Sequence, residues 1–322
     1  MTAPDIGVFL PTSTAPGTPP GDVAAAARHA EEVELESVWA IDQLVAGTGA
    51  PILDAGLALA AAAAATTRVR LGFGVMILPL RPVVWAAKQV ATLQHLSGDR
   101  ALLGVGVGGD RHDLSWQAAG VPRRERGART DAALRVLPGL IAGKPTTLGR
   151  AGGGPGDGAD LGDAGGPTVQ LAPAATVPPI VVGGMSRAAM ARAAAHGDGW
   201  FTMPVPPAEL TAARAQVAEL AAAQGRPAPS TTGSLLTVLD GDPAVPGDDE
   251  LTRVLTDPDG VYGMPAEAVD EVVVRGGPAT VAAELAALGE AGADRVVASL
   301  AAGDWHRQVE LLGEAQRLLR TP

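Results

Sequence analysis

Residues 69–109 constrain the fold most, because they contain two mostly apolar segments joined by one helical segment. Residues 69–78 and 101–107 lack the alternation of polar and apolar residues that marks a strand with one exposed face. Such segments are typical of strands that are buried on both faces, as in a parallel sheet. Helical periodicity over residues 82–96 supplies the crossover connection, so this stretch predicts a βαβ unit.

Several glycines lie inside these two predicted strands: Gly72, Gly74, Gly104, Gly106 and Gly108. A glycine within a strand often marks a bulge or a place where a ligand approaches the backbone. The alternative is that the glycines only relieve crowding inside a small barrel. We favour ligand contact for Gly74, Gly106 and Gly108, which lie toward the carboxyl ends of the strands.

The alternation of strands and helices continues along the whole chain. The predicted strands cover residues 5–10, 37–41, 69–78, 101–107, 180–182, 200–203, 232–239 and 295–299. The predicted helices cover residues 22–35, 52–66, 82–96, 127–142, 186–196, 207–223, 279–291 and 305–319. This order predicts an α/β protein, a single (β/α)8 TIM barrel over residues 1–322.

Two stretches depart from the alternation and account for the extra length of the chain. A Gly- and Asp-rich insertion occupies residues from about 144 to 178, and we expect a flexible surface segment ending in a short edge strand over 168–171. A second irregular excursion, polar and rich in proline, occupies residues from about 240 to 277.

Composition excludes several classes of function. The formal net charge of −11 argues against binding of nucleic acid, which needs clustered Lys and Arg. The absence of cysteine removes disulfides, thiolate metal sites and cysteine nucleophiles. The longest apolar stretch, residues 55–65, is too short to span a bilayer, so we expect a cytoplasmic protein with no membrane partner. The lysines, Lys88 and Lys144, do not lie at predicted strand ends, which disfavours Schiff-base chemistry.

In a TIM barrel the active site lies at the carboxyl ends of the strands. There the sharpest local motif is Gly183-Gly184-Met185-Ser186, between a predicted buried strand and a predicted helix. Glycines let backbone amides face a ligand, and a helix N-terminus carries partial positive charge, so the motif predicts a phosphate cradle. The alternative is that Ser186 only caps the helix.

A polar tetrad at residues 110–113 follows the fourth predicted strand and contains Asp110 and His112. These are the nearest titratable groups to the predicted mouth of the barrel, although a solvated loop is the competing interpretation. No second set of ligands accompanies them, so we expect no metal site. The other histidines are expected to be surface or packing residues: His29, His95, His196 and His306.

Five segments in chain order resemble the bacterial luciferase-like monooxygenase family. They are SVWAID (37–42), VRLGFGV (69–75), LQHLSGDR with LGVGVG (93–108), IVVGG (180–184) and AGADRVV (291–297). The resemblance covers nearly the whole chain and implies a barrel that binds the deazaflavin coenzyme F420 or FMN in its mouth. It also implies a non-proline cis peptide after the third strand, at Gly74–Val75.

The resemblance places the cofactor against residues at the strand ends. The expected cofactor contacts are Asp42, Gly74, Val75, Met76, Gly106, Gly108, Gly183, Gly184, Met185 and Ser186. The alanine-rich composition, with arginine favoured over lysine, looks like that of a high-GC actinobacterial gene, where the deazaflavin is common. We therefore take F420 as the first choice and FMN as the second.

Two positions depart from the family pattern. Deazaflavin-dependent members often have Asp-His where this chain has Asp42-Gln43, and sugar-phosphate dehydrogenases of the family have glutamate where Gly109 stands. Glutamine can hold a substrate by hydrogen bonds but cannot carry a proton near neutral pH. The expected catalytic group is therefore Gln43 with Asp110 and His112, of which one of the last two would transfer the proton.

The resulting hypothesis is an oxidoreductase that transfers hydride between the deazaflavin and a small organic acceptor with an activated C=C or C=N bond. One alternative is an FMN-dependent monooxygenase that uses reduced flavin and O2, and another is a noncatalytic flavin-binding protein. A small-molecule substrate is expected and a homodimer is kept open. The substrate itself, the direction of the reaction and the role of the Gly-rich insertion are left open by the sequence.

Overall fold

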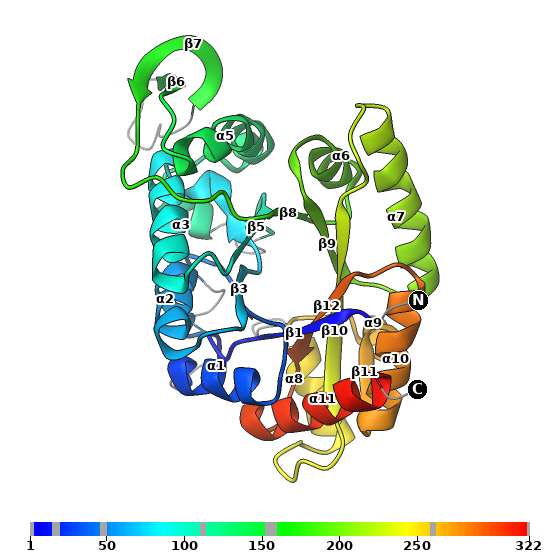
Figure 1. The fold of residues 1–322 in the computed structure, drawn as a ribbon. Helices are drawn as coiled ribbons and strands as arrows, with labels where there is room; N and C mark the ends of the chain where they lie inside the picture. Colours follow the sequence, from blue (N-terminus) through cyan, green and yellow to red (C-terminus); the bar gives the residue numbers. More distant parts are fainter. Residues whose placement is uncertain are drawn as a thin grey trace.

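The computed structural model describes residues 3–14, 20–45, 50–109, 114–151, 160–257 and 262–320. Eight parallel strands close into a barrel (Figure 1), which confirms the predicted (β/α)8 class. They are β1 (Asp5–Phe9), β2 (Ser37–Ala40), β3 (Arg70–Phe73), β5 (Ala101–Gly106), β8 (Ile180–Gly183), β9 (Gly199–Pro204), β10 (Ser230–Leu239) and β12 (Arg295–Leu300). Pairing of β9 with β10 and of β12 with β1 closes the ring.

Helices surround the strands on the outside (Figure 1). They are α1 (Val23–Glu32), α2 (Ala55–Ala65), α3 (Val83–Ser97), α5 (Arg126–Ile141), α6 (Arg187–His196), α7 (Pro207–Ala222), α10 (Pro278–Glu290) and α11 (Trp305–Arg320). Side chains cap several of these helices, as when Asp22 accepts a hydrogen bond from the Ala25 amide at 3.0 Å. Across the described residues, no helix combines the length and apolar character needed to span a membrane.

Alternate residues of the barrel strands enter two separate apolar layers. One layer lies between strands and helices and includes Ile6, Val8 and Leu103. The other fills the barrel interior with the buried side chains of Trp39, Leu102, Val181, Phe201 and Val297, joined by the half-buried Phe9 and Val75. Strands buried on both faces explain why the sequence shows continuous apolar runs.

Charged side chains meet at the amino ends of the strands, opposite the mouth. Arg295 donates two hydrogen bonds of 2.8 Å to the Glu36 carboxylate, and Arg70 lies 3.9 Å from the same group. Burial pushes the pKa of Glu36 upward, but the hydrogen bonds and charge of Arg295 outweigh it and hold this pKa below its ordinary value. Burial and then the Glu36 charge raise the pKa of Asp5. An ion network therefore lies at the amino ends of β12, β1, β2 and β3.

The single strand predicted over residues 69–78 is divided in two. The peptide bond between Gly74 and Val75 is cis, as the resemblance implied, and it separates β3 from β4 (Met76–Ile77). A 3-10 turn, η1 (Leu78–Leu80), follows and leads into α3. The prediction of one continuous strand was wrong because the register against β5 shifts between Gly72, which pairs with Leu102, and Met76, which pairs with Val105.

The insertion contains more structure than the sequence predicted. Strands β6 (Thr146–Ala151) and β7 (Asp160–Val169) form an antiparallel pair beyond α5 (Figure 1). The expected edge strand over 168–171 is wrong in its bounds, because β7 begins earlier and ends at Val169. Hydroxyl groups of Thr147 and Thr168 lie 2.9 Å apart across the pair. Such a ribbon is held by its own ladder and needs no buried run in its sequence.

In its described parts, 240–257 and 262–277, the second excursion contains regular elements where the sequence predicted an irregular segment. It contains α8 (Asp248–Thr256), α9 (Ala266–Val272) and β11 (Val273–Gly276). Leu251 and Leu255 of α8 are buried against Leu236 and Val238 of β10. Strand β11 pairs with residues 236–239 of β10, beyond the segment of β10 that pairs with β9. The Leu pair at i and i+4 was the available signal for α8.

Candidate active site

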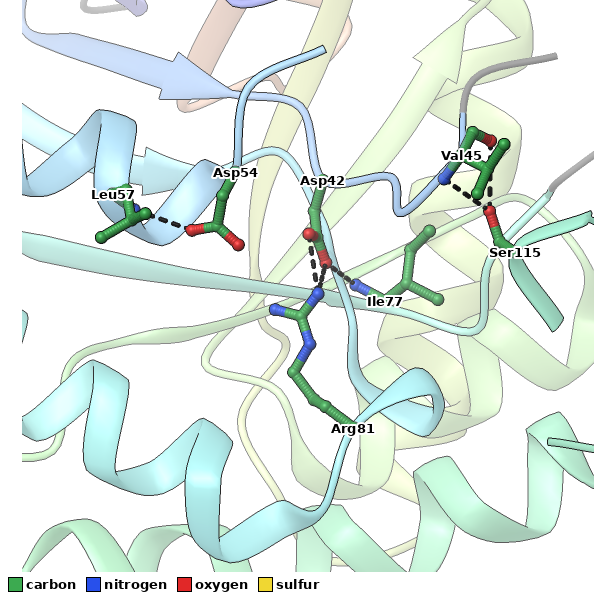
Figure 2. A network of polar contacts seen from close by, with 7 residues as sticks. All are labelled: Asp42, Val45, Asp54, Leu57, Ile77, Arg81 and Ser115. Atoms are coloured by element: carbon green, nitrogen blue, oxygen red, sulfur yellow. Dashed lines mark hydrogen bonds and ion pairs between the residues drawn. The ribbon is translucent and has the colours of Figure 1, made fainter. Parts of the chain in front are cut away.

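The Asp42 carboxylate, directly after β2, organises one side of the barrel mouth (Figure 2). Its Oδ2 accepts a hydrogen bond of 2.7 Å from the Ile77 amide, and Arg81 Nη2 lies 2.8 Å from both carboxylate oxygens. The side chain of Asp42 is only 4% exposed. Asp42 therefore ties the end of β2 to β4 and to the start of α3, and its predicted contact with the cofactor stays a prediction.

Val75 occupies a space that three glycines on neighbouring strands leave open. A Cβ at Gly106 would lie 2.5 Å from Val75 Cγ2, one at Gly104 would lie 3.0 Å from Cγ1, and one at Gly183 would lie 3.1 Å from Cγ1. Real Cβ atoms essentially never approach so closely as the first of these. Glycine is thus needed at Gly106 on β5, and at Gly183 on β8 it relieves a tight contact with the Val75 side chain.

The remaining predicted ligand glycines are also crowded by the chain itself. A Cβ at Gly74 would lie 2.4 Å from the Phe9 ring, and one at Gly108 would lie 2.8 Å from both Ile77 and Trp116. Gly108 also has a φ of +81°, which favours glycine. The crowding interpretation, held open in the sequence, therefore explains Gly74, Gly106 and Gly108, and cofactor contact at these positions stays a prediction.

Aromatic and aliphatic side chains form an apolar floor beneath the mouth. The rings of Phe9 and Phe201 are stacked with centroids 6.4 Å apart, and Trp39 meets Phe201 edge-on at 5.1 Å. Val75 belongs to the same cluster. The next inward position of β9 is Met203, which is 60% exposed. A flat, apolar ring system is the kind of ligand that such a floor accommodates.

The predicted phosphate cradle has the expected local structure. Strand β8 ends at Gly183, Gly184 has a φ of +116°, and α6 begins after Ser186, whose Oγ accepts a 3.2 Å hydrogen bond from the Ala189 amide. The Gly184 amide, however, donates to the Phe201 carbonyl at 2.9 Å. An anion here would therefore be bound by the amides of residues 185–187. Gly184 would provide the backbone conformation of the turn and, having no side chain, would leave space for the anion.

One candidate residue near this cradle was missed from the sequence. Thr202 is 4% exposed, and its hydroxyl has no hydrogen-bond partner. The register pairs Gly183 with Phe201, so the next residues, Gly184 and Thr202, are neighbours at the ends of β8 and β9. A polar residue in the otherwise apolar segment 200–203 was the available signal, since buried hydroxyls are normally paired.

The segment after Asp42 is tied to α4 (Leu114–Ala118). The side-chain Nε2 of Gln43 donates to the Val45 carbonyl at 2.9 Å. Ser115 Oγ accepts from the Val45 backbone amide at 3.1 Å (Figure 2 shows this second pair). Gln43 is half-buried in this arrangement. The predicted catalytic residues Asp110 and His112 lie outside the described residues, so the role assigned to them stays a prediction.

The other histidines make packing contacts. His29 and His306 meet with ring centroids 5.0 Å apart, and His95 Nε2 lies 3.0 Å from the Ala174 carbonyl. Burial is the main cause that lowers the pKa of His196. Within the described ranges, no group of three or more His, Cys, Asp or Glu side chains is arranged to hold a metal ion.

Comparison with known sequences gives one family match. The sequence profile of the luciferase-like monooxygenases matches residues 5–245. An uncharacterized protein of Mycobacterium tuberculosis is 36% identical over 182 residues, which is 56% of this chain and 58% of that protein. A 4-hydroxyprotoasukamycin monooxygenase of Streptomyces nodosus is 31% identical over 118 residues, 36% of this chain and 31% of that enzyme. The chain thus aligns with little more than half the length of the first of these relatives.

Comparison with solved structures supports the barrel over its full length. An F420-dependent secondary alcohol dehydrogenase, in complex with an F420–acetone adduct, has a TM-score of 0.80 at 19% identity and covers 100% of both chains. The oxygenating constituent of the FMN-bound 3,6-diketocamphane monooxygenase from Pseudomonas putida has a TM-score of 0.70 at 18% identity, with 97% of both chains covered. At these identities the likeness concerns the fold alone.

Proposed function

The chain belongs to the luciferase-like monooxygenase family, and we propose that it transfers a hydride from reduced coenzyme F420 to a small organic acceptor. The acceptor would carry an activated C=C or C=N bond. The observation that carries the proposal is the apolar floor of Phe9, Val75 and Phe201 beside the glycine-rich start of α6. Together they offer a flat surface for a ring and, at its edge, backbone donors for a phosphate.

The residues present fit a cofactor of this kind. Val75, which lies against glycines of β5 and β8, would back the ring, and Asp42 would hold β4 in place behind it. Amides of residues 185–187 would bind the phosphate, and the unpartnered hydroxyl of Thr202 lies in the neighbouring strand. When bound, the reduced deazaflavin supplies the hydride and, unlike a reduced flavin, reacts little with O2.

The chain's own polar groups have separate parts in the proposed reaction. Gln43 would orient the acceptor through hydrogen bonds of its side-chain amide. It would not transfer the proton, because it has no group that titrates near neutral pH. Asp110 or His112 would deliver the proton that completes reduction, and solvent is the competing source. Gly109, in place of the glutamate of sugar-phosphate dehydrogenases, disfavours oxidation of an alcohol of that kind.

A second candidate is FMN-dependent monooxygenation with reduced flavin and O2. It is favoured by the 31% identity to 4-hydroxyprotoasukamycin monooxygenase and by the fold shared with the FMN-bound diketocamphane enzyme. The apolar floor suits the ring system of either cofactor. The two cofactors differ in the group attached beyond the ring and in whether the reduced ring reacts with O2.

Turnover assays separate these functions. Reduced F420 is mixed anaerobically with a panel of activated alkenes and imines, and reduced FMN is mixed with the same compounds under O2. The proposal expects acceptor-dependent oxidation of F420 without O2, while O2-dependent product with FMN alone would contradict it.

Asp110→Asn and His112→Ala then test the proton donor, since loss of a positioned acid typically slows a reaction roughly 10²–10⁴-fold. Less than a tenfold effect in both variants would favour solvent as the donor.

A further inference from the structure

The hydroxyl group of Ser115 makes two hydrogen bonds to one residue of the mouth. Ser115 lies in α4 and is completely buried. Its Oγ accepts from the Val45 backbone amide at 3.1 Å and donates to the Val45 carbonyl at 3.2 Å (Figure 2). Val45 follows β2 and precedes Ser115 by 70 residues in the chain. One buried side chain therefore holds both backbone polar groups of a residue from a different loop.

The side chain of Gln43 meets Ser115 at the same carbonyl oxygen. Gln43 Nε2 donates to the Val45 carbonyl at 2.9 Å, and the two lone pairs of that oxygen allow it to accept from Ser115 Oγ as well. This bond assigns the two ends of the Gln43 amide, because only its nitrogen can donate to a carbonyl. Among the described residues, Gln43 Oε1 accepts no hydrogen bond. Oε1 and the second hydrogen of Nε2 are thus left for a ligand.

Gln43 stands between two fixed points of the backbone. On one side, the Asp42 carboxylate accepts a hydrogen bond from the Ile77 amide. On the other side, the amide and carbonyl of Val45 are bound by the serine hydroxyl. Trp116, the residue after that serine in α4, is buried against Ile77. Both fixed points therefore rest on the same part of the structure, and each has its own hydrogen bonds.

We propose that Ser115 is a positioning residue, which sets the orientation of the Gln43 side-chain amide toward the acceptor by holding Val45. This inference rests on the proposed function, in which Gln43 orients the acceptor, and extends it to a residue that does not touch the acceptor. Without the serine hydroxyl, the Val45 carbonyl loses a donor and can turn away, so that Gln43 Nε2 loses its fixed partner. Asp42 keeps its own partners, and the cofactor side of the mouth is left unchanged.

A double-mutant cycle tests this role. Reduced F420 is assayed with the acceptor, from the panel of activated alkenes and imines, on which the native protein is most active. The variants are Ser115→Ala, Gln43→Ala and both together. The matched control is Ser97→Ala at the amino end of β5, opposite the mouth. Its hydroxyl also bonds one backbone amide, of Arg100 at 3.2 Å, and one carbonyl, of Gln94 at 3.4 Å.

We expect Ser115→Ala and Gln43→Ala each to lower kcat/KM for the acceptor about three- to tenfold, the effect of losing one positioned hydrogen bond. The double variant should lose no more than Gln43→Ala alone, because Ser115 acts only through Gln43. Ser115→Cys, with a weaker hydrogen-bonding group of similar size, should lie between the native protein and Ser115→Ala. The dissociation constant of F420 should stay unchanged, whereas a general loosening of the mouth would raise it. Ser97→Ala should change neither quantity.

The outcomes separate this inference from the proposed function. Multiplicative losses in the double variant, or F420 binding that weakens in parallel with activity, would overturn the role of Ser115 while leaving F420 as the cofactor. Failure of the native protein to oxidise reduced F420 with any acceptor of the panel would overturn both. Thermal unfolding of each variant is measured in parallel, and Ser115→Cys decides the question if Ser115→Ala does not fold.

Discussion

Arg81 Nη2 lies 2.8 Å from both carboxylate oxygens of Asp42, so a single guanidinium nitrogen faces the whole acid group (Figure 2). The second hydrogen-bond donor to Oδ2 is the backbone amide of Ile77, in the short strand that follows the cis peptide. This carboxylate thereby joins the end of β2 to the segment that contains Ile77 and Arg81, 35 and 39 residues further along the chain.

Replacing Arg81 with Met should lower the stability of the folded protein, because the Asp42–Arg81 ion pair holds segments of the mouth together. The variant leaves a nearly buried carboxylate without its cation, which typically costs about 3–5 kcal/mol, and somewhat less here because the Arg81 side chain is 20% exposed. Urea unfolding measures the change, and Arg28→Met is the control. A loss equal to that of the control would show that Asp42 and Arg81 do not hold the mouth together.

Gly106→Ala should displace Val75, since the added Cβ would lie 2.5 Å from Val75 Cγ2. We expect at least tenfold weaker cofactor binding, with much of it restored in the double variant Gly106→Ala with Val75→Ala. Gly247→Ala, where a Cβ meets nothing within 4 Å, serves as control. Additive effects in the double variant would contradict the proposed fit between these two residues.

Gly184→Val should abolish tight cofactor binding, because a side chain would enter the space assigned to the phosphate. The φ of +116° adds a conformational cost of about 1–3 kcal/mol, so the matched control is Gly225→Val, at a φ of +67° with open space around it. Both variants should lose stability in thermal unfolding, but only the first should lose affinity in cofactor titration. Unchanged affinity in Gly184→Val would remove the phosphate from this loop.

Tyr262 should ionise far above the ordinary range. Burial raises the pKa of its phenol to about 12, and it is the chain's only tyrosine, so phenolate absorbance reports it alone. The raised pKa means that the phenol keeps its proton to a higher pH in the folded state than in the unfolded state. Stability should therefore fall as the pH rises from about 10 toward 12. A native titration that coincides with that of the urea-unfolded chain would contradict the burial of Tyr262.

Much of the fold and part of the site could be predicted from the sequence. Strands such as β5 and β8 carry continuous apolar runs because both faces are buried, and this pattern needs no tertiary information. The glycine pair at 183–184 was visible as a turn between a strand and a helix. The cis bond at Gly74–Val75 was accessible only through the family resemblance, since no local pattern predicts it.

Other features depend on contacts that a linear sequence does not display. Arg81 meets Asp42 only after two strands and a turn have folded together, so their pairing has no local signature. Hairpin β6–β7 is held by its own ladder, and its glycine-rich sequence therefore resembles a loop. The hydrogen bond from the Gly184 amide to the Phe201 carbonyl follows from the register of β8 and β9, which the spacing of residues in the sequence does not reveal.

Direct comparison of cofactor affinity tests the central claim most closely. The purified chain is titrated with oxidised F420 and, separately, with FMN, in the same buffer and with tryptophan and cofactor fluorescence as readouts. We expect F420 to bind at least about tenfold more tightly than FMN, a difference of about 1.4 kcal/mol in binding free energy. Tighter binding of FMN, or no binding of F420 at all, would contradict the assignment of this protein as a deazaflavin-dependent oxidoreductase.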